Sequence, residues 1–287
     1  MSLSSRTPNL HLLAVVGGGD SILVSHLIEH YRALGVESFL LIRHAESTLD
    51  PDYEAIDFYV KQAGLALYDT WLGPWDDKTH ESRMRAVMAD RPDDWFVLVD
   101  LDEFHLYDRP LPELIKLCES GGYSFAKGCY VDRVSIDGSF PDIDSRSLWE
   151  QYPLGGAVTA HLLDAIPLKV GVALGRTLVC GGHHVGGLGN VGLPRRQSYI
   201  QVHHFKWTGS VLERTRRRIQ RYESGSWKLA YDKVLTDAHR LMSYVDSHGG
   251  RIDITEKRFH LRPAAKHYGS HPLWSEIVKD AARWEYD

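Results

Sequence analysis

The chain of 287 residues is poor in cysteine and has no long, uninterrupted apolar run. Its three cysteines are far apart and form no CxxC pair, which excludes a disulfide framework and a cysteine-rich zinc module. The longest apolar-looking segment, residues 157–175, contains charged residues and a proline, so we expect no transmembrane segment. Residues 1–9 are polar and do not resemble a secretory signal. These absences favour a cytoplasmic protein, with a peripheral position at the inner membrane surface as the alternative.

The chain also lacks an excess of basic residues, since its formal net charge is −5. Nucleic-acid binders are usually basic, so we expect no nucleic-acid partner. With 43% hydrophobic and 25% charged residues, the composition is that of an ordinary globular protein. The length suits one large domain with an appendage.

Short apolar runs alternate with helical patterns through the first half of the chain. This alternation predicts an α/β fold with a mostly parallel central sheet flanked by helices, of the Rossmann-like kind. We expect this domain to span residues 1–208 and to be followed by a helical C-terminal extension, residues 209–287. The predicted strands are 10–16, 38–42, 65–68, 95–99, 123–134 and 200–205, and the predicted helices are 20–34, 53–63, 78–90, 111–118, 210–222, 226–247 and one that starts at residue 270.

Three carboxylates follow the apolar strand 95–99, at Asp100, Asp102 and Glu103. Ligands of open α/β sheets bind beyond the carboxyl ends of the strands. Alternation along a strand would point Asp100 and Asp102 the same way. Two converging carboxylates repel each other unless a cation lies between them, and Mg²⁺ or Mn²⁺ prefers such oxygen ligands. The segment therefore predicts a divalent-cation site for a diphosphate, and its plain alternative is a solvated acidic turn.

Residues 95–104 resemble the tryptophan–hydrophobic–DxDEF signature of GT-A fold glycosyltransferases, in the bacterial family 2-like group. Residues 30–39 and 45–50 resemble elements around the first helix and the second strand of that family, and residues 202–208 resemble its late histidine element. The resemblance covers about residues 10 to 210. The chain departs from the family pattern at Gly17-Gly18-Gly19-Asp20, where members carry Asn-Glu, and at Glu46, which replaces an aspartate.

The resemblance implies a metal-dependent transferase of the hexosyltransferase type. Asp102 would bind the metal directly, Asp100 would contact the ribose or the metal, and His204 would complete the metal shell. The implied cofactor is Mn²⁺ or Mg²⁺, and an imidazole ligand favours manganese. The implied donor is a nucleotide-sugar, a UDP-sugar first, and the transfer is expected to invert the sugar. The acceptor would be a carbohydrate, a lipid-linked molecule or a small molecule.

Other residues are candidates for binding the donor, and each also has a plain structural explanation. A glycine before a helix lets a backbone approach a nucleotide, but it also makes a tight turn. The glycine-rich loop 181–192 could close over the donor as a lid, or be a loop only. Basic residues at a helix start are most often solvated. The donor-binding candidates are Gly17, Asp50, Lys78, Arg83, His183 and Lys206.

Inverting transfer needs a base that accepts the proton of the acceptor hydroxyl. Asp142, Asp144 and Glu150 lie in an irregular region where such a base is expected, although acidic loops are usually just solvated. The arginine-rich segment 213–221 is a solvated helix face, or it contacts a diphosphate, an anionic acceptor or a membrane surface.

Two other functions stay open at this point. Metal-dependent nucleotidyltransferases and phosphoesterases also use carboxylates at strand ends, but a sugar nucleotidyltransferase would need a basic residue in the glycine-rich N-terminal loop. The absence of Asn-Glu after the first strand leaves room for a nucleotide-sugar-binding protein without catalysis.

Overall fold

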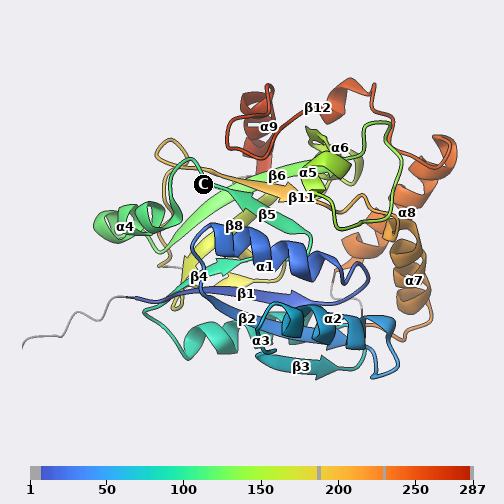
Figure 1. Cartoon of the computed structure of the whole chain (residues 1–287). Helices are drawn as coiled ribbons and strands as arrows, with labels where there is room; N and C mark the ends of the chain where they lie inside the picture. The colour runs from blue at the N-terminus through green and yellow to red at the C-terminus, as the bar shows by residue number, and fades with distance from the viewer. Residues whose placement is uncertain (1–7, 186–188, 229–230, 285–287) are drawn as a thin grey trace, which may run out of the picture.

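A computed structural model describes residues 8–185, 189–228 and 231–284 of the chain. Within these residues the strands form one ten-stranded sheet and one two-stranded sheet (Figure 1). The strands of the large sheet are β1 (Leu10–Val16), β2 (Ser38–Ala45), β3 (Asp69–Leu72), β4 (Trp95–Leu98), β5 (Glu103–Leu106), β6 (Phe125–Val134), β7 (Leu154–Gly156), β8 (Leu168–Leu174), β11 (Ile200–His204) and β12 (Arg262–Pro263), and the small sheet pairs β9 (Val179–Cys180) with β10 (His184–Val185).

Helices connect most of these strands, and none of those described is long and apolar enough to cross a membrane. They are α1 (Leu23–Ala33), α2 (Pro51–Gln62), α3 (Asp77–Ala89), α4 (Leu111–Gly121), α5 (Leu148–Gln151), α6 (Val158–Leu162), α7 (Val211–Glu223), α8 (Asp232–Ser247) and α9 (Trp274–Ala281), with 3₁₀ turns η1 (Lys257–Phe259) and η2 (Ala282–Trp284).

The order of the large sheet is β12-β7-β6-β8-β4-β1-β2-β3, with β11 beside β6 and β5 beside β11. The strands β3, β2, β1 and β4 are parallel neighbours, and β11 is parallel to β6. Each antiparallel pair in the described part of this sheet involves β5, β7 or β8. The predicted α/β fold, with a mostly parallel central sheet flanked by helices, is confirmed.

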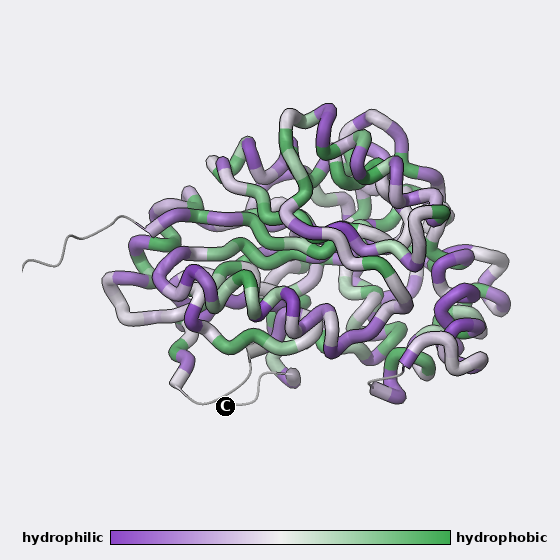
Figure 2. Tube along the Cα trace, turned by 90° about the horizontal axis from the view of Figure 1, so that it is seen from below, coloured by the Kyte–Doolittle hydropathy of each residue, from purple (hydrophilic) through white to green (hydrophobic). Residues whose placement is uncertain are grey.

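Apolar residues cover both faces of the sheet, as a buried parallel strand requires. Along β1, Leu12 and Ala14 face a core shared with α1, α2 and α4, whereas Leu13 faces a second core shared with α3. Figure 2 shows hydrophobic segments running through the middle of the molecule and hydrophilic ones around its rim. The helices α1, α2 and α4 therefore lie on one face, and α3 lies on the other with Val179 of β9.

The C-terminal part is attached to the sheet by two cores. Leu241 and Val245 of α8 pack with Val134 of β6, and Ile277 of α9 packs with Leu168 of β8. The strand β12 also extends the sheet through β7. In Figure 1, α7 and α8 lie at the end of the sheet toward which β1 and β11 point. Residues 209–284 thus carry the expected helices and add one strand, while the domain boundary at 208 stays a prediction.

Several local expectations need correction. Asp20 does not cap α1, because its φ is +64° and its carboxylate instead accepts hydrogen bonds from the hydroxyls of Thr208 and Ser210 at 2.7 Å each. The third strand is 69–72 rather than 65–68, and β4 ends at Leu98. The sequence patterns missed β5, β7, β8 and the two short helices α5 and α6. Of the predicted helix 226–247, α8 covers 232–247, and residues 229–230 lie outside the described residues.

Candidate metal centre

The carboxyl ends of β4 and β11 meet at one edge of the sheet. Because β11 is parallel to β6, and both β6 and β4 are antiparallel to β8, the two strands run in the same direction. The acidic segment that follows β4 and the histidine that ends β11 therefore lie at the same edge. The backbone amide of Phe205, just after β11, confirms this by donating to the Asp102 carbonyl at 2.8 Å.

A turn separates the first two carboxylates of the acidic segment. Residues 101–102 form the turn, and the amide of Glu103 donates to the carbonyl of Asp100 at 3.0 Å before β5 begins. The expectation that strand alternation would point Asp100 and Asp102 the same way is therefore wrong, because the strand has already ended. The two carboxylates have different partners: Lys169 lies beside Asp100, and His204 lies beside Asp102.

Glu103 is fully buried and its charge is balanced inside the fold. The Lys169 ammonium on β8 lies 2.9 Å from Glu103 Oε1 and 2.9 Å from Asp100 Oδ2, and the hydroxyl of Tyr130 donates to Glu103 Oε1 at 2.7 Å. Burial opposes ionisation of Glu103, but the Lys169 ammonium outweighs it and holds the pKa of Glu103 well below its usual range. The same pair of carboxylates overcomes the burial of Lys169 and raises its pKa well above normal. Glu103 is therefore a structural anion.

Asp102 and His204 face each other in a geometry that suits a shared cation. Asp102 Oδ2 lies 3.6 Å from His204 Nε2, which is too long for a good hydrogen bond. His204 Nδ1 lies 3.0 Å from Oδ1 of the buried Asp132. A carboxylate only accepts hydrogen bonds, so Nδ1 carries a proton, and Nε2 is the ring nitrogen that faces Asp102. An outer carboxylate that orients a histidine in this way is the usual arrangement around protein-bound metals.

Asp132, on β6, is held by four donors. The amide and the hydroxyl of Thr159 each donate at 2.6 Å, Trp207 Nε1 donates at 3.2 Å, and His204 supplies the fourth. Burial opposes ionisation of Asp132, but these donors, His204 first, keep its pKa below the usual value. The ring of Tyr130 stacks on His204 with centroids 4.2 Å apart. The orientation of His204 is thus determined by packing and by hydrogen bonds.

Lys206 lies two residues after the end of β11 and adds positive charge near Asp102. Burial and the nearby Arg218 guanidinium lower the pKa of Lys206 to about 8, and the Asp102 carboxylate acts against this shift. Arg214 of α7 donates to the Lys206 carbonyl at 3.3 Å and pairs with Asp20 at 3.4 Å. The structure therefore places residues 102, 204 and 206 near one another, with Arg214 and Arg218 of α7 beside them.

Gly17 and Asp50, two donor-binding candidates, have structural roles. A side chain at Gly17 would collide with the backbone carbonyl of His44, so the glycine allows β1 and β2 to approach closely. The carboxylate of Asp50 caps α2 by accepting from the amide of Asp52 at 3.1 Å.

Replacing Asp50 with alanine is expected to lower the free energy of unfolding by about 1 kcal/mol, the usual value of an N-cap side chain. Chemical denaturation of Asp50→Ala measures this loss. Nucleotide affinity should stay unchanged, and a large loss of affinity without a loss of stability would instead return Asp50 to the binding site.

Lys78 and Arg83 are engaged outside the metal centre. Lys78 is exposed and lies 3.3 Å from the hydroxyl of Tyr231, while Arg83 pairs with Asp69 on β3. Both are residues of α3, as the sequence predicted. Their partners explain them as surface contacts of this helix.

The three candidate bases differ in their partners. Asp144 forms two hydrogen bonds to Arg146 Nε, at 3.1 and 3.0 Å, and a third to the terminal nitrogen of that guanidinium, which together hold its pKa below normal. Glu150 is exposed on α5. Asp142 is exposed and its carboxylate lies against Gly209, three residues beyond Lys206. Of the three, Asp142 is the one that the fold places next to the segment of the metal centre.

His183 is brought to the acidic segment from the other side. Its Nε2 lies 3.8 Å from Asp100 Oδ1 and its Nδ1 lies 3.9 Å from Glu103 Oε2. It belongs to the turn between β9 and β10, and residues 186–188 of the predicted glycine-rich loop lie outside the described residues. The sequence patterns did not indicate the contacts that Lys169, Tyr130 and Asp132 make with the site. Tyr130 and Asp132 occupy alternate positions of a long strand, which is the one signal that they share a face.

No protein-family model and no curated protein sequence matches the chain. One similar solved structure is described as a glucose-1-phosphate thymidylyltransferase from Bacillus anthracis in complex with sucrose, with 11% identity over 49% of this chain and 62% of that chain and a TM-score of 0.28. Another is an apo UDP-glucose pyrophosphorylase, with 10% identity over 84% of this chain and 100% of that chain and a TM-score of 0.31. The match spans less than two thirds of the first of these chains. Similarity at this level carries no functional argument, so the geometry of the site has to supply it.

Proposed function

We propose that the protein is a metal-dependent glycosyltransferase of the GT-A type that transfers a sugar from a nucleotide-sugar to an acceptor hydroxyl. One observation carries the proposal: Asp102 Oδ2 and His204 Nε2 face each other at 3.6 Å, with Asp132 holding the other ring nitrogen of His204. These two residues would hold a divalent cation, since Mn²⁺ or Mg²⁺ accepts carboxylate together with diphosphate oxygens. The resemblance of residues 95–104 and 202–208 to the family supports the same assignment.

Different residues of this chain have different roles in the proposed reaction. A bound cation supplies charge neutralisation for the diphosphate that leaves the sugar. Asp102 and His204 would hold that cation, and Asp132 accepts from Nδ1 of His204 and so orients the ring with Nε2 toward Asp102. Lys206 provides a second positive charge at the same edge of the sheet. Asp142 is the proposed base: it takes the proton of the acceptor hydroxyl while that oxygen bonds to the anomeric carbon and the bond to the diphosphate oxygen breaks.

The loop after β1 does not favour the nucleotidyltransferase alternative. The backbone amide of Gly19 is occupied by the Asp52 carboxylate, and Asp20 adds another negative charge. Arg214 reaches this loop but is paired with Asp20. A nucleoside triphosphate would therefore meet acids where such an enzyme needs a free basic residue.

Thermal melting with nucleotides and Mn²⁺ tests the donor site. UDP with Mn²⁺ should raise the melting temperature because a ligand that binds only the folded state stabilises it. GDP and dTDP serve as competitors that identify the base. If all three nucleotides leave the melting temperature unchanged in the presence of metal, the proposal is wrong. Release of UDP from UDP-sugars with Mn²⁺ then separates an enzyme from a binding protein without catalysis.

The outer carboxylate offers a more specific prediction. Asp132→Asn should weaken Mn²⁺ affinity by about 10–100-fold, the usual effect of losing such a partner. The Asp132 carboxylate accepts four hydrogen bonds, and the amide group of asparagine would direct its own N–H groups at some of these donors. Calorimetric titration of Mn²⁺ measures the change. The exposed Asp246 on α8 supplies a matched control, since Asp246→Asn makes the same substitution at an exposed helix position. Equal Mn²⁺ affinity in the two variants would contradict the role given to Asp132.

A further inference from the structure

Two imidazoles and a carboxylate converge on the face of the sheet covered by α3, apart from Asp102 and His204. His80 of α3, Asp100 and His183 each offer a ligand atom, and these atoms lie within 4.8 Å of one another. His80 is 7% exposed and His183 is 2% exposed. The three residues come from separate parts of the chain, so only the fold brings them together.

The ring of His183 lacks partners that its burial requires. Both of its ring nitrogens are buried and neither has a hydrogen-bond partner among the described residues. Its nearest acceptors are Asp100 Oδ1 at 3.8 Å and Glu103 Oε2 at 3.9 Å, both beyond hydrogen-bond reach. A buried polar atom without a partner is costly, so an unfilled ligand position next to this ring is the simplest explanation.

We propose that His80, Asp100 and His183 form a second metal site, for a transition-metal dication of the zinc type. Two imidazoles and one carboxylate are a common ligand set for Zn²⁺ and leave its fourth position open. Asp100 Oδ2 contacts the Lys169 ammonium, and Asp100 Oδ1 lies on the side of His183. The same carboxylate would therefore contact Lys169 with one oxygen and the metal with the other. Glu103 Oε2 lies 3.9 Å from Nδ1 of His183 and adds negative charge beside the proposed site.

The local charge selects a cation over a phosphate. Asp100 and Glu103 carry two negative charges, Lys169 carries one positive charge, and metal-ligating imidazoles are neutral, which leaves a net charge of −1. A dication is attracted by this charge, whereas a diphosphate is repelled. A ring that is 2% exposed also has no surface to offer a nucleotide. The donor-binding role expected for His183 is therefore replaced here by metal binding.

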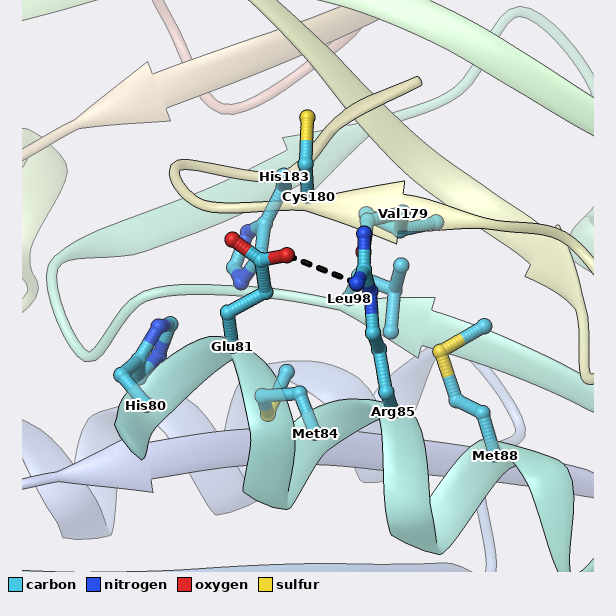
Figure 3. Close-up of a pocket in the computed structure, with 9 residues that line it drawn as sticks. All are labelled: His80, Glu81, Met84, Arg85, Met88, Leu98, Val179, Cys180 and His183. Carbon is cyan, nitrogen blue, oxygen red and sulfur yellow. Dashed lines mark hydrogen bonds and ion pairs between the residues drawn. The ribbon is translucent and has the colours of Figure 1, made fainter. Parts of the chain in front are cut away.

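A pocket borders two of the three proposed ligands, His80 and His183. Figure 3 shows the rings of His80 and His183 at the same end of a pocket that Met84 and Leu98 also line. The sulfur of Cys180 points away from both rings, and it donates to the His184 carbonyl at 3.2 Å. Cys180 is thus not the fourth ligand, which leaves that position to water. The metal would join α3, the acidic turn and the β9–β10 hairpin.

A second histidine cluster differs from the one around His183 in its hydrogen bonds. His161 and His260 both direct Nε2 at Asp280 Oδ2, at 3.1 and 2.9 Å. These hydrogen bonds account for both ring atoms that face the carboxylate. Among the described residues, the ring nitrogens of His183 form no such bonds, and the proposal therefore concerns the cluster around His183.

Metal content and Co²⁺ titration test the proposal. The chelator-treated chain should bind one Zn²⁺ or Co²⁺ with the visible absorption of a nitrogen–oxygen site, and Zn²⁺ at 100 times its dissociation constant should raise the melting temperature by about 5 °C. His183→Ala and His80→Ala should lose both effects. His184→Ala changes the neighbouring histidine of the same hairpin and should keep them.

The two metal sites are separated by performing the titration in Asp102→Asn. Retention of one Zn²⁺ there, together with its loss in His183→Ala, supports the proposal whether or not the chain proves to be a glycosyltransferase. The absence of stoichiometric Zn²⁺ and Co²⁺ binding by the unsubstituted chain overturns it, and this result does not depend on any variant folding. Binding that survives in both His80→Ala and His183→Ala overturns it as well.

Discussion

Asp102→Asn is expected to reduce Mn²⁺-dependent release of nucleotide from the donor by at least about 100-fold, because loss of a metal ligand should exceed the 10–100-fold effect of losing an outer partner. The asparagine keeps the size of the side chain and the backbone contact of residue 102 with Phe205, but it removes the charge that faces His204. Steady-state assays at several Mn²⁺ concentrations measure the loss. The melting temperature without metal should change little, because the Asp102 side chain is 17% exposed and its 3.6 Å contact with His204 is too long for a good hydrogen bond.

Asp246→Asn is the matched control for this experiment, because it removes a carboxylate from the exposed side of α8. It should retain full activity. If Asp102→Asn kept the activity of the unsubstituted chain at every Mn²⁺ concentration, the metal centre would be misassigned, whatever the donor sugar.

Lys169→Met is expected to destabilise the fold by about 3–5 kcal/mol at pH 8, the usual cost of breaking a buried ion pair by removing one partner. The substitution leaves Glu103 fully buried with a charge and without its cation. Denaturant unfolding measures the loss. The double variant Lys169→Met/Glu103→Gln should recover much of the stability, since no uncompensated charge then remains at position 103.

The pH dependence of the same variant has a definite sign. In the unsubstituted chain the pKa of Glu103 is depressed, so the stability it contributes is lost only as the pH falls through that low folded value. Without Lys169, burial raises the folded pKa of Glu103 above its unfolded value. Lys169→Met should therefore be more stable at pH 5 than at pH 8 relative to the unsubstituted chain. A penalty that is equal at both pH values would contradict the pairing.

The parallel half of the fold was predictable because its elements carry local signals. The run Leu10–Val16 is apolar at nearly every position, as a strand buried on both faces must be, and it is β1 as predicted. The helix predicted at 78–90 is α3 at 77–89, and its start coincides with the cap that Asp76 provides. Such boundaries depend on neighbouring residues only.

The antiparallel half was not predictable from local patterns. The strand β8 contains Lys169, a residue that argues against burial until its two distant carboxylates are known. The strand β5 begins inside the acidic motif, at Glu103, where charge suggests an exposed turn. In both strands a charge is buried because its partner comes from another part of the chain, and a single sequence does not show that pairing.

The sequence indicated Asp102 and His204 as candidate site residues, but it did not indicate Asp132, which orients His204. Asp102 and His204 were expected to meet, and the directions of β4 and β11 bring them together. Asp132, which orients His204, lies inside a strand and had no motif to mark it. His80 did have a signal, since it precedes Met84 by four residues and so shares the buried face of α3.

The anomalous scattering of Mn²⁺ in crystals grown with UDP tests the central claim most directly. The account predicts a manganese peak between the Asp102 carboxylate and His204 Nε2, in contact with both phosphates of UDP. UDP bound elsewhere, or manganese bound with no contact to Asp102 and His204, would contradict it.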